Sequence, residues 1–479
     1  MSVDVIKIEN VHSWLLTDDP GVRRKLHLAL RAREKGYIHS KAYKQKLWDG
    51  YKEFFKPSSG MFLTGLLPMV LAALKTMNRN YKIVDMRQRI VWEHTEIQQN
   101  FLQQWNPPGE PLIELHDYQA DYINQSLKYY RGLVTPPTAS GKTLILLGIL
   151  KCLPPKTPVL FITKNAGLVN QNYEEMKKWG IPDVGRYYGG HKEFNYIMCV
   201  TSHKDTFQGI AHLLPKFKVL IVDEVHECVS DVPQKAYQKM TNAVCRYGIS
   251  ATPFKFAGKD KVQKYTVMGH FGAVFKTTTT ESGYLTTKDL QEKGILSKSR
   301  CTFYPIDEPK NIAYEPYMEA VSLGIATNIE FLKKVRDLAR SLKGRTLILV
   351  ERIDQGDYLQ QLIPEAHWLK GADKLDDRAE VFKELKYGEN VICICMRQII
   401  TAGINVFVHN ILNASGGQAE HSVIQQMGRG LRRASDKDIL DFYDFIFNTN
   451  EYLYKHSCNR MKVLVDEGHE VTLKDKIDF

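Results

Sequence analysis

The chain has 479 residues, which is more than one hydrophobic core usually holds, so we expect two to four domains. Its 43% hydrophobic and 25% charged residues are typical of a globular protein and exclude a disordered or low-complexity chain. The 65 Lys and Arg residues outnumber the 54 Asp and Glu residues, and the net charge of +11 favours a polyanionic partner.

Two further patterns exclude other classes of protein. The eight cysteines form no C-x-x-C pair, so the sequence predicts neither a zinc site nor a disulfide framework. The first residues form no apolar signal segment. The longest apolar stretch, residues 61–74, contains Gly65 and Pro68 and is too short to span a bilayer. We therefore expect a cytoplasmic protein with no membrane partner, in which residues 61–74 form a buried helix.

Most of the positive charge lies in the first quarter of the chain. Residues 1–105 hold 17 Lys and Arg residues and 10 Asp and Glu residues, a surplus of 7 out of the total of 11. The cluster NPPGEP at 106–111 combines residues that break helices and strands and marks the end of this region. We expect a separate basic domain over residues 1–108 that binds nucleic acid, and a solvated basic face is the alternative.

Two later regions alternate short apolar runs with helical stretches, which is typical of parallel α/β sheets. Most of these runs are nearly continuous in apolar residues, as strands buried on both faces should be. The predicted strands are residues 132–135, 158–163, 196–202, 218–224 and 247–252, followed by 345–350, 390–396, 409–415 and 440–445. We expect two doubly wound sheets of similar size in domains 109–302 and 303–479, with residues 300–314 as the link.

Residues 131–153 follow the order strand, loop and helix, with the helix beginning near Lys142. In the pattern G-x-x-x-x-G-K-[ST], the loop amides and the helix N-terminus hold phosphates, and the lysine reaches the β and γ oxygens. Pro136 replaces the first glycine, and a chance Gly-Lys-Thr at a helix start is the alternative interpretation. Thr143 is expected on a magnesium ion. The residues predicted to bind the nucleotide here are Thr138, Ala139, Ser140, Gly141, Lys142 and Thr143.

The segment KVLIVDEVH (218–226) is a buried apolar strand that ends in two adjacent carboxylates. Unpaired buried charge is unfavourable, and a bound Mg²⁺ explains Asp223 while a water molecule awaiting activation explains Glu224. A strand end that emerges into solvent is the alternative. Ligands of open α/β sheets bind at the carboxyl ends of strands, where both motifs lie. Together they predict hydrolysis of a nucleoside triphosphate with Mg²⁺.

The ordered series of motifs resembles the superfamily 2 helicases and translocases. It consists of PTASGKT (137–143), TKNAGLVNQ (163–171), DEVH (223–226), SATP (250–253), TAGIN (401–405) and QQMGRGLRR (425–433). Their order and spacing resemble that family over residues 115–435. The resemblance implies an α/β fold with two tandem RecA-like doubly wound parallel-sheet domains and a small α+β N-terminal domain.

The resemblance also implies further nucleotide contacts. HDYQ (116–119) resembles the motif that reads adenine, with Gln119 bonded to the base and Tyr118 packed nearby. Relatives often carry Gly-x-Asp in the fifth motif, where this chain has Gly403 and Asn405. An asparagine can still bond a ribose hydroxyl, so the departure concerns nucleotide selectivity and not hydrolysis.

Two more groups of residues take roles from the resemblance. His226, Ser250 and Thr252 would couple the nucleotide state to movement between domains, and ordinary loop capping is the alternative. In a helical QQMGRGLRR, two arginines three positions apart share a face and can stabilise the charge on the γ-phosphate. An exposed surface pair is the alternative, and their presence in one chain is consistent with a working monomer. The residues of this motif expected to act in catalysis are Gln425, Arg429 and Arg432.

Candidate DNA contacts lie at or after strand ends and in the basic N-terminal region. Arg397 stands near a position where many relatives carry a threonine that touches the nucleic-acid backbone. Trp48 of the segment 44–55 could stack on bases or belong to the core of its own domain. The candidate DNA-binding residues are Lys44, Lys46, Lys52, Lys164, Thr201, Ser202, Arg352 and Arg397.

Residues 44–55 and 254–300 resemble the equivalent stretches of UvsW-like phage recombination and branch-migration helicases. The resemblance implies an ATP-dependent DNA helicase or translocase that remodels forks or junctions in recombination, repair or replication. A phage-encoded protein would act in the host cytoplasm. The alternatives are an RNA helicase, the motor subunit of a restriction-type complex, and a non-enzymatic DNA-binding scaffold.

Overall fold

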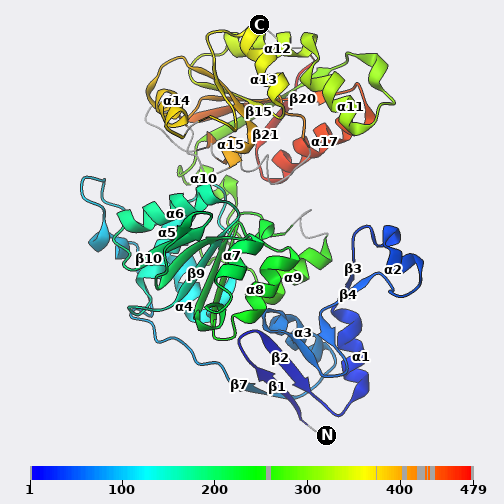
Figure 1. The fold of residues 1–479 in the computed structure, drawn as a ribbon, viewed down its shortest axis with the longest axis vertical. Coiled ribbons are helices and arrows are strands. Elements are labelled where there is room, and N and C mark those ends of the chain that lie inside the picture. Colours follow the sequence, from blue (N-terminus) through cyan, green and yellow to red (C-terminus); the bar gives the residue numbers. More distant parts are fainter. Residues whose placement is uncertain are drawn as a thin grey trace. The chain divides into compact units, whose positions relative to one another are not determined.

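The computed structural model describes residues 3–254, 260–373, 375–401, 407–417, 427–428, 430–431 and 437–475. The chain divides into two compact units (Figure 1). The first contains residues 1–136 and 141–285, and the second contains residues 137–140 and 286–479. Within the described residues, no helix combines the length and the apolar character needed to cross a membrane.

The first unit begins with a small α+β domain, as predicted. Its five-stranded sheet has the order β5-β6-β2-β1-β7, in which only β1 and β7 pair in parallel. Its helix α1 starts at a cap in which Asp19 Oδ1 accepts hydrogen bonds from the amides of Gly21 and Val22. The elements of this sheet and its helices are β1 (Asp4–Ile8), β2 (His12–Leu16), α1 (Pro20–Ala29), β5 (Phe55–Lys56), β6 (Met61–Leu63), α3 (Leu67–Thr76) and β7 (Tyr81–Asp85).

The apolar stretch at 61–74 is not a single helix, contrary to the sequence prediction. Its first three residues form β6, which pairs with both β2 and β5, and a 3₁₀ turn (Thr64–Leu66) leads into α3. The helix α3 buries Val70 and Leu74 in the core of the domain. Pro68 in the first turn explains why helix α3 begins where it does, because proline is favoured there and disfavoured further inside a helix.

A small arm extends from this domain (Figure 1). It consists of the antiparallel pair β3 (Arg31–Arg33) and β4 (Tyr51–Glu53), together with a 3₁₀ turn (Tyr37–His39) and α2 (Lys41–Lys44). Arginine side chains lie over tyrosine rings on the arm, with Arg31 Cζ 4.3 Å and Arg33 Cζ 4.8 Å from the ring centre of Tyr51. These stacked pairs hold the two strands together where the arm has little apolar core.

The rest of the first unit is a seven-stranded sheet with helices on both faces (Figure 1). Its order is β11-β10-β12-β9-β13-β14-β8, and all pairs except β10 with β11 are parallel. The strands are β8 (Arg131–Val134), β9 (Val159–Thr163), β10 (Val184–Tyr188), β11 (His191–Lys192), β12 (Ile197–Thr201), β13 (Val219–Asp223) and β14 (Cys245–Ile249). The helices are α4 (Asp117–Tyr129), α5 (Lys142–Lys151), α6 (Ala166–Lys178), α7 (Lys204–Gly209), α8 (Asp231–Lys239) and α9 (Lys261–Phe271).

The five strands predicted for this sheet are all present as β8, β9, β12, β13 and β14. Strands β10 and β11 were not predicted from the sequence. β11 is a two-residue strand at the edge of the sheet, and β10 beside it carries Gly185 and Arg186, so neither shows the continuous apolar run of a central strand.

The N-terminal domain packs directly on α9 of this sheet. Gly65 lies so close that a Cβ atom would stand 2.0 Å from the carbonyl oxygen of Met268, and Gly269 similarly approaches Leu63. The ring of Phe54 meets the ring of Tyr265 edge to face at 5.4 Å. Backbone is therefore in contact with backbone, with no side-chain layer between the two parts at this point.

The second unit contains a seven-stranded, wholly parallel sheet of order β17-β18-β16-β19-β20-β15-β21. Its strands are β15 (Lys298–Ile306), β16 (Thr346–Val350), β17 (His367–Leu369), β18 (Ile392–Met396), β19 (Asn410–Asn413), β20 (Ile439–Phe447) and β21 (Glu470–Leu473). Its helices are α10 (Thr287–Glu292), α11 (Tyr317–Val321), α12 (Ile329–Ser341), α13 (Ile353–Leu362), α14 (Leu375–Tyr387), α15 (Arg397–Thr401) and α17 (Glu451–Asp466). The two parallel α/β sheets predicted from the sequence are thus confirmed.

The expectation of a link at residues 300–314 was wrong for its first part. Residues 300–306 belong to β15, which pairs with β20 along its whole length. Two prolines, Pro305 and Pro309, suggested the link, and only Pro305 lies in β15. Pro305 lies beyond the stretch Arg300–Phe303 that pairs with β21, so its missing amide breaks no ladder bond there. The expected domain boundary between residues 302 and 303 falls inside this strand.

Candidate active site

The predicted phosphate loop joins β8 to α5 at the carboxyl edge of the first parallel sheet. Helix α5 begins at Lys142, and its cap, Gly141, has a left-handed backbone with φ of 80°. A Cβ atom at Gly141 would lie 2.3 Å from Nε2 of Gln119, so only glycine fits this position. Ala139 also has a positive φ, of 63°. The turn directs the first amides of α5 outward from a helix N-terminus, the arrangement that binds anions.

The residues predicted to read the base lie beside this loop. Gln119 Oε1 accepts a hydrogen bond of 2.8 Å from the amide of His116 and so caps the start of α4. Tyr118 is fully buried, and its ring stacks on His116 with centres 5.5 Å apart. Burial also raises the pKa of the Tyr118 hydroxyl far above its ordinary value. Gln119 therefore connects the beginning of α4 to the turn that holds the phosphate loop.

The structure brings the two phosphate-site motifs together. Asp223 is the last residue of β13, and the next residue, Glu224, has a left-handed backbone with φ of 45° and ψ of 54°. The amide of Glu224 donates to Asp223 Oδ1 at 3.0 Å. This turn brings Glu224 Oε1 to 3.1 Å from Nζ of Lys142, which comes from the phosphate loop 82 positions earlier.

The other carboxylate oxygen of Glu224 faces the motif that follows β14. Ser250 Oγ donates to Glu224 Oε2 at 3.2 Å, and His226 Nδ1 lies 2.9 Å from the same serine oxygen. A serine hydroxyl has one proton, so a serine that donates to the carboxylate must accept from His226. The amide of Thr252 also donates to Ser250 Oγ, at 3.2 Å. The hydroxyl of Ser250 therefore connects the carboxylate to both predicted coupling residues.

The charge of Glu224 is set by these neighbours. Burial alone would raise its pKa most strongly, but the charges of Lys142 and His226 and the hydrogen bonds from Lys142 and Ser250 outweigh it and hold the pKa below its ordinary value. Glu224 is therefore ionised at neutral pH, as an acceptor of protons must be.

Oxygen ligands suited to a magnesium ion are present at the same edge. Thr143 lies exposed on the first turn of α5, next to Lys142, and Asp223 ends β13 beside Glu224. Hydroxyl and carboxylate oxygens are ligands that Mg²⁺ accepts, usually together with water and phosphate oxygens. The residues present therefore fit this ion.

The DNA-contact candidates of the first sheet lie at the same carboxyl edge. Lys164 follows β9 and forms an ion pair with Glu227, with 2.9 Å between Nζ and Oε1. Thr201 is buried and its hydroxyl lies 2.7 Å from that of Thr206, while the amide of Ser202 donates to the carbonyl of Thr163. Glu227 directly follows DEVH but was not predicted from the sequence as a neighbour of Lys164.

The arginine candidates of the second unit are each paired with a nearby carboxylate. Arg352 at the start of α13 binds Asp354 through two hydrogen bonds of 3.1 and 2.9 Å. Arg397 at the start of α15 lies 2.6 Å from an oxygen of Glu351. A phosphate that contacts either guanidinium must therefore compete with, or share, an existing carboxylate.

Five predicted site residues lie outside the described residues, and their roles stay predictions. They are Gly403, Asn405, Gln425, Arg429 and Arg432.

Comparison with known proteins gives concordant results. A family model described as "Type III restriction enzyme, res subunit" matches residues 112–255. The chain is 26% identical over 400 residues to the DNA 3'-5' translocase XPB2 of Sulfurisphaera tokodaii, covering 75% of this chain and 88% of that protein. It is 22% identical over 404 residues to the ATP-dependent DNA helicase uvsW of Enterobacteria phage T4, covering 76% and 78%.

Solved structures share the fold. The ATP-dependent Type ISP restriction-modification enzyme LlaBIII, solved bound to DNA, matches with a TM-score of 0.54 at 14% identity, over 85% of this chain and 34% of that one. Dbp5 of S. cerevisiae, solved bound to RNA and ADP BeF3, matches with a TM-score of 0.50 at 13% identity, over 74% and 89%. The chain therefore has the tandem α/β fold of superfamily 2 helicases and resembles their UvsW-like members.

Proposed function

We propose that this chain, which resembles the UvsW-like members of superfamily 2, is an ATP-dependent DNA helicase or translocase that remodels branched DNA. The observation that carries the proposal is the contact of Lys142 with Glu224, and of Glu224 with Ser250, at the carboxyl edge of the first parallel sheet. This arrangement joins a phosphate loop, a general base and a coupling residue in one hydrogen-bonded set.

Each residue of the set has a defined task in ATP hydrolysis. The amides at the start of α5 and the ammonium group of Lys142 bind the β- and γ-phosphates. A Mg²⁺ ion held by Thr143 and Asp223 would neutralise charge on the phosphate oxygens. Glu224 orients the attacking water and accepts its proton while the bond from the γ-phosphorus to the leaving oxygen breaks. Arg429 and Arg432 would stabilise the charge of the transition state.

Binding of the phosphates also prepares the base. Lys142 lowers the pKa of Glu224 by its charge and by its hydrogen bond. A γ-phosphate that attracts Lys142 weakens that contact, which raises the proton affinity of Glu224 when the water must lose its proton. Ser250 then remains as the donor that keeps the carboxylate oriented.

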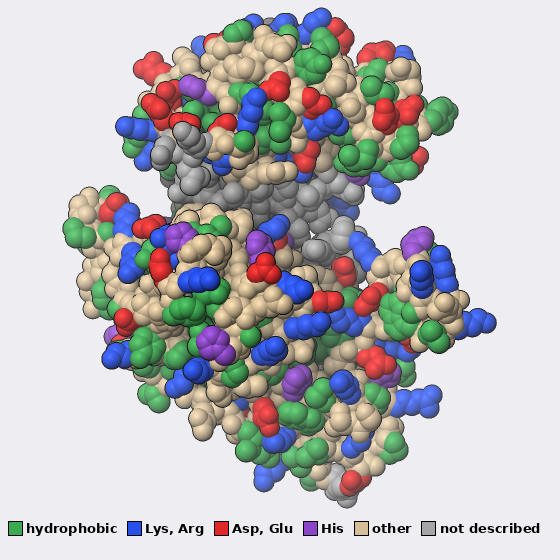
Figure 2. Space-filling view, in the orientation of Figure 1, with side chains coloured by type: hydrophobic (Ala, Val, Ile, Leu, Met, Phe, Trp, Pro, Cys, Tyr) green, Lys and Arg blue, Asp and Glu red, His purple; other side chains and the backbone are tan. Residues whose placement is uncertain are grey.

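DNA binding by the N-terminal domain is supported by its arm. Lysine and arginine side chains gather on the arm, and Lys44 and Lys46 are exposed there (Figure 2). Lys52 is half-buried, with its Nζ 5.8 Å from the ring centre of Phe54. Trp48 donates from Nε1 to the carbonyl of Tyr51 at 2.8 Å, which favours a structural role for its ring over base stacking. The arm therefore offers phosphate contacts more readily than base contacts.

The catalytic part of the proposal is tested by Lys142→Ala, with Lys151→Ala at the other end of α5 as the matched control. Loss of the phosphate-binding cation should reduce ATP turnover by roughly 10²-fold or more, whereas the control should keep wild-type turnover. A Lys142→Ala protein that hydrolyses ATP at the wild-type rate would falsify the assignment.

The polymer and its structure need a second assay. ATPase stimulation by duplex DNA, single-stranded DNA and RNA separates a DNA motor from an RNA helicase. Unwinding of forks, four-way junctions and simple partial duplexes then tests the preference for branched DNA. The matched family model also favours a second candidate, the motor of a restriction-type complex, for which a co-purifying nuclease chain is the expected sign.

A further inference from the structure

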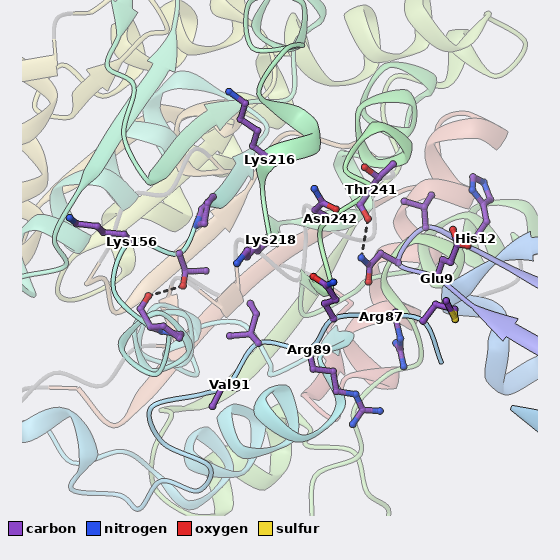
Figure 3. Close-up of a pocket in the computed structure, with 18 of the residues that line it drawn as sticks. Glu9, His12, Arg87, Arg89, Val91, Lys156, Lys216, Lys218, Thr241 and Asn242 are labelled. Carbon is purple, nitrogen blue, oxygen red and sulfur yellow. Dashed lines mark hydrogen bonds between the residues drawn. The ribbon is translucent and has the colours of Figure 1, made fainter. Parts of the chain in front are cut away.

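The first unit carries a large basic groove on the opposite edge of its parallel sheet. The groove has a volume of about 920 Å³ and lies where strands begin, since Pro158, Lys218 and Asn242 directly precede or closely approach β9, β13 and β14 (Figure 3). The five residues of β9 or β13 span about 13 Å at roughly 3.3 Å per residue. The groove is therefore separated from the candidate active site by the full length of the strands.

The two walls of the groove are fixed to each other. Residues 9–12 and 86–91, which belong to or follow the N-terminal domain, form one wall, and the loops before β9, β13 and β14 form the other. Asn10 Nδ2 donates to the carbonyl of Thr241 at 2.9 Å across the groove, and Arg131 Nη2 donates to the carbonyl of Asn10 at 2.7 Å. The groove is thus already formed without a ligand, which reduces the entropy lost on binding.

Positive charge dominates this groove. Five of its described lining residues are lysine or arginine, and Glu9, the one acidic residue among them, is paired with Lys7 outside the groove. Arg87 and Arg89 share the carboxylate of Asp85, which lies next to the groove. The three lysines are exposed and form no ion pair within the described residues. They are Lys156, Lys216 and Lys218.

The three lysines come from two segments: Lys156 lies in the loop before β9, and Lys216 and Lys218 lie two positions apart in the segment that leads into β13. Lys218 lies between Lys156 on one side and Arg87 and Arg89 on the other (Figure 3). Lys156 stands in a proline-rich turn, PPKTP, closed by hydrogen bonds from the amide and the hydroxyl of Thr157 to the carbonyl of Pro154. This turn holds the lysine backbone in a left-handed conformation with φ of 59°.

The lining chemistry identifies the ligand class. Among the described residues, no phenylalanine, tyrosine or tryptophan lines the groove, so these residues offer no platform for stacked bases. His12 is half-buried in the wall of the groove, and burial together with the charges of Lys56 and Arg246 lowers the pKa of His12, so its ring is neutral at physiological pH. The available contacts are therefore lysine and arginine cations with amide and hydroxyl groups around them, a set that favours phosphates over stacked bases.

We propose that this groove binds the phosphate backbone of a DNA segment other than the one held at the carboxyl edge of the same sheet. The proposal rests on the proposed DNA-motor function and deepens it. Two phosphate-binding surfaces on opposite edges of one compact unit would let the chain hold two arms of a branched molecule at once. Simultaneous binding of two arms raises the affinity for branched DNA above that for a single short duplex.

The test is a triple variant, Lys156→Ala, Lys216→Ala and Lys218→Ala, compared with a control that removes the same charge elsewhere. Lys288→Ala, Lys310→Ala and Lys334→Ala form that control, because these three lysines are exposed and lie in the second unit. Binding of a four-way junction and of a short duplex is measured by fluorescence anisotropy at several salt concentrations. A second triple variant, Lys156→Arg, Lys216→Arg and Lys218→Arg, keeps the positive charge and shows whether charge alone accounts for junction binding.

Three lost phosphate contacts should flatten the slope of log affinity against log salt by about 2.7 for the junction. When the salt concentration rises from about 50 to 200 mM, the affinity for the junction falls in both proteins. The factor by which it falls should be about 40 times smaller for the groove variant than for the wild type. The short duplex, the control variant and the Arg version should keep wild-type slopes.

The outcomes separate this proposal from the function on which it rests. A wild-type protein whose ATPase responds to no DNA would refute the DNA-motor function itself. If DNA stimulates the wild type but the groove variant keeps the wild-type junction slope, only the groove assignment is wrong. An equal loss of slope in the control variant would also overturn it, because general charge would then explain the effect.

Discussion

Removal of the hydroxyl oxygen of Ser250 should reduce DNA unwinding more than it reduces ATP hydrolysis. In Ser250→Ala, Glu224 Oε2 loses the hydroxyl that donates to it at 3.2 Å. The imidazole of His226 and the amide of Thr252 lose their shared acceptor at the same time. Lys142 keeps its contact with the other oxygen of Glu224, so the phosphate-binding part of the site is preserved.

The size of the effect follows from the bonds removed. A hydrogen bond to a charged group contributes about 1.5–3 kcal/mol, and a buried group left without its partner costs about 1–3 kcal/mol. Ser250 is fully buried, and His226 is 2% exposed. We therefore expect the free energy of unfolding to fall by about 1–3 kcal/mol.

The same change has a defined pH signature. The Ser250 hydroxyl is among the groups that lower the pKa of Glu224, so removing it raises that pKa. Because the ionised carboxylate is the active form, the acid limb of the ATPase profile should move to higher pH. The carboxylate with a depressed pKa also stabilises the fold above the pKa it has in the unfolded chain. That contribution is lost as the pH falls from the unfolded-state pKa through the folded-state pKa. In the variant the folded-state pKa is higher, so the loss is smaller and is complete at a higher pH.

The assay measures ATP turnover and unwinding of a forked duplex in the same reaction, with urea unfolding alongside. We expect Ser250→Ala to hydrolyse ATP at neutral pH within about tenfold of the wild type while it unwinds fewer base pairs per ATP. Ser250→Thr, which retains the hydroxyl, should recover coupling if the added methyl group fits. Unchanged unwinding per ATP together with an unshifted acid limb would refute the role of Ser250.

Two further predictions use matched positions. Gly141→Ala should abolish ATP binding measured with a fluorescent nucleotide, because the added Cβ would clash with Gln119. Gly189 also has a positive φ, of 51°, but has open space around it, so Gly189→Ala should retain ATP binding. Equal losses in both variants would show that backbone strain, and not the contact with Gln119, causes the loss of ATP binding. The side chains of Arg460 and Asp444 form an ion pair in which they are 1% and 0% exposed. Arg460→Ala should lower the free energy of unfolding by about 3–5 kcal/mol, because it leaves the buried carboxylate of Asp444 without this cation. Arg300→Ala breaks an exposed pair of similar geometry and should lower it by no more than about 1 kcal/mol in the same urea titration, so similar losses would contradict the burial argument.

The sequence was sufficient to predict the parts of the site that depend on the parallel sheet. The carboxyl ends of parallel strands lie on one edge, so a phosphate loop after β8 and a carboxylate pair after β13 had to meet there. The contact between Lys142 and Glu224 follows from that rule. The positions of the interior strands also followed, because strands buried on both faces need continuous apolar runs.

Features that depend on packing between distant segments were not predictable in this way. The approach of Gln119 to Gly141 depends on how α4 packs beside the phosphate loop, and no local pattern encodes it. The groove lysines come from two segments that are distant in the sequence, and each lysine by itself has the pattern of a solvated residue before a strand. The strand β15 was mistaken for a link because prolines weigh heavily in sequence patterns, whereas the pairing of β21 ends before Pro305.

The glycine contact between the N-terminal domain and α9 has a mechanical consequence. Side chains that interdigitate can change rotamers and slide, but Gly65 meets the backbone of α9 with no such layer to shear. The arm that carries Lys44 and Lys46 would then keep its position relative to the first sheet. DNA gripped by the arm would keep a constant distance from Lys164 at the edge of that sheet throughout the ATP cycle. The length of each step would accordingly be set by the travel of the other unit alone.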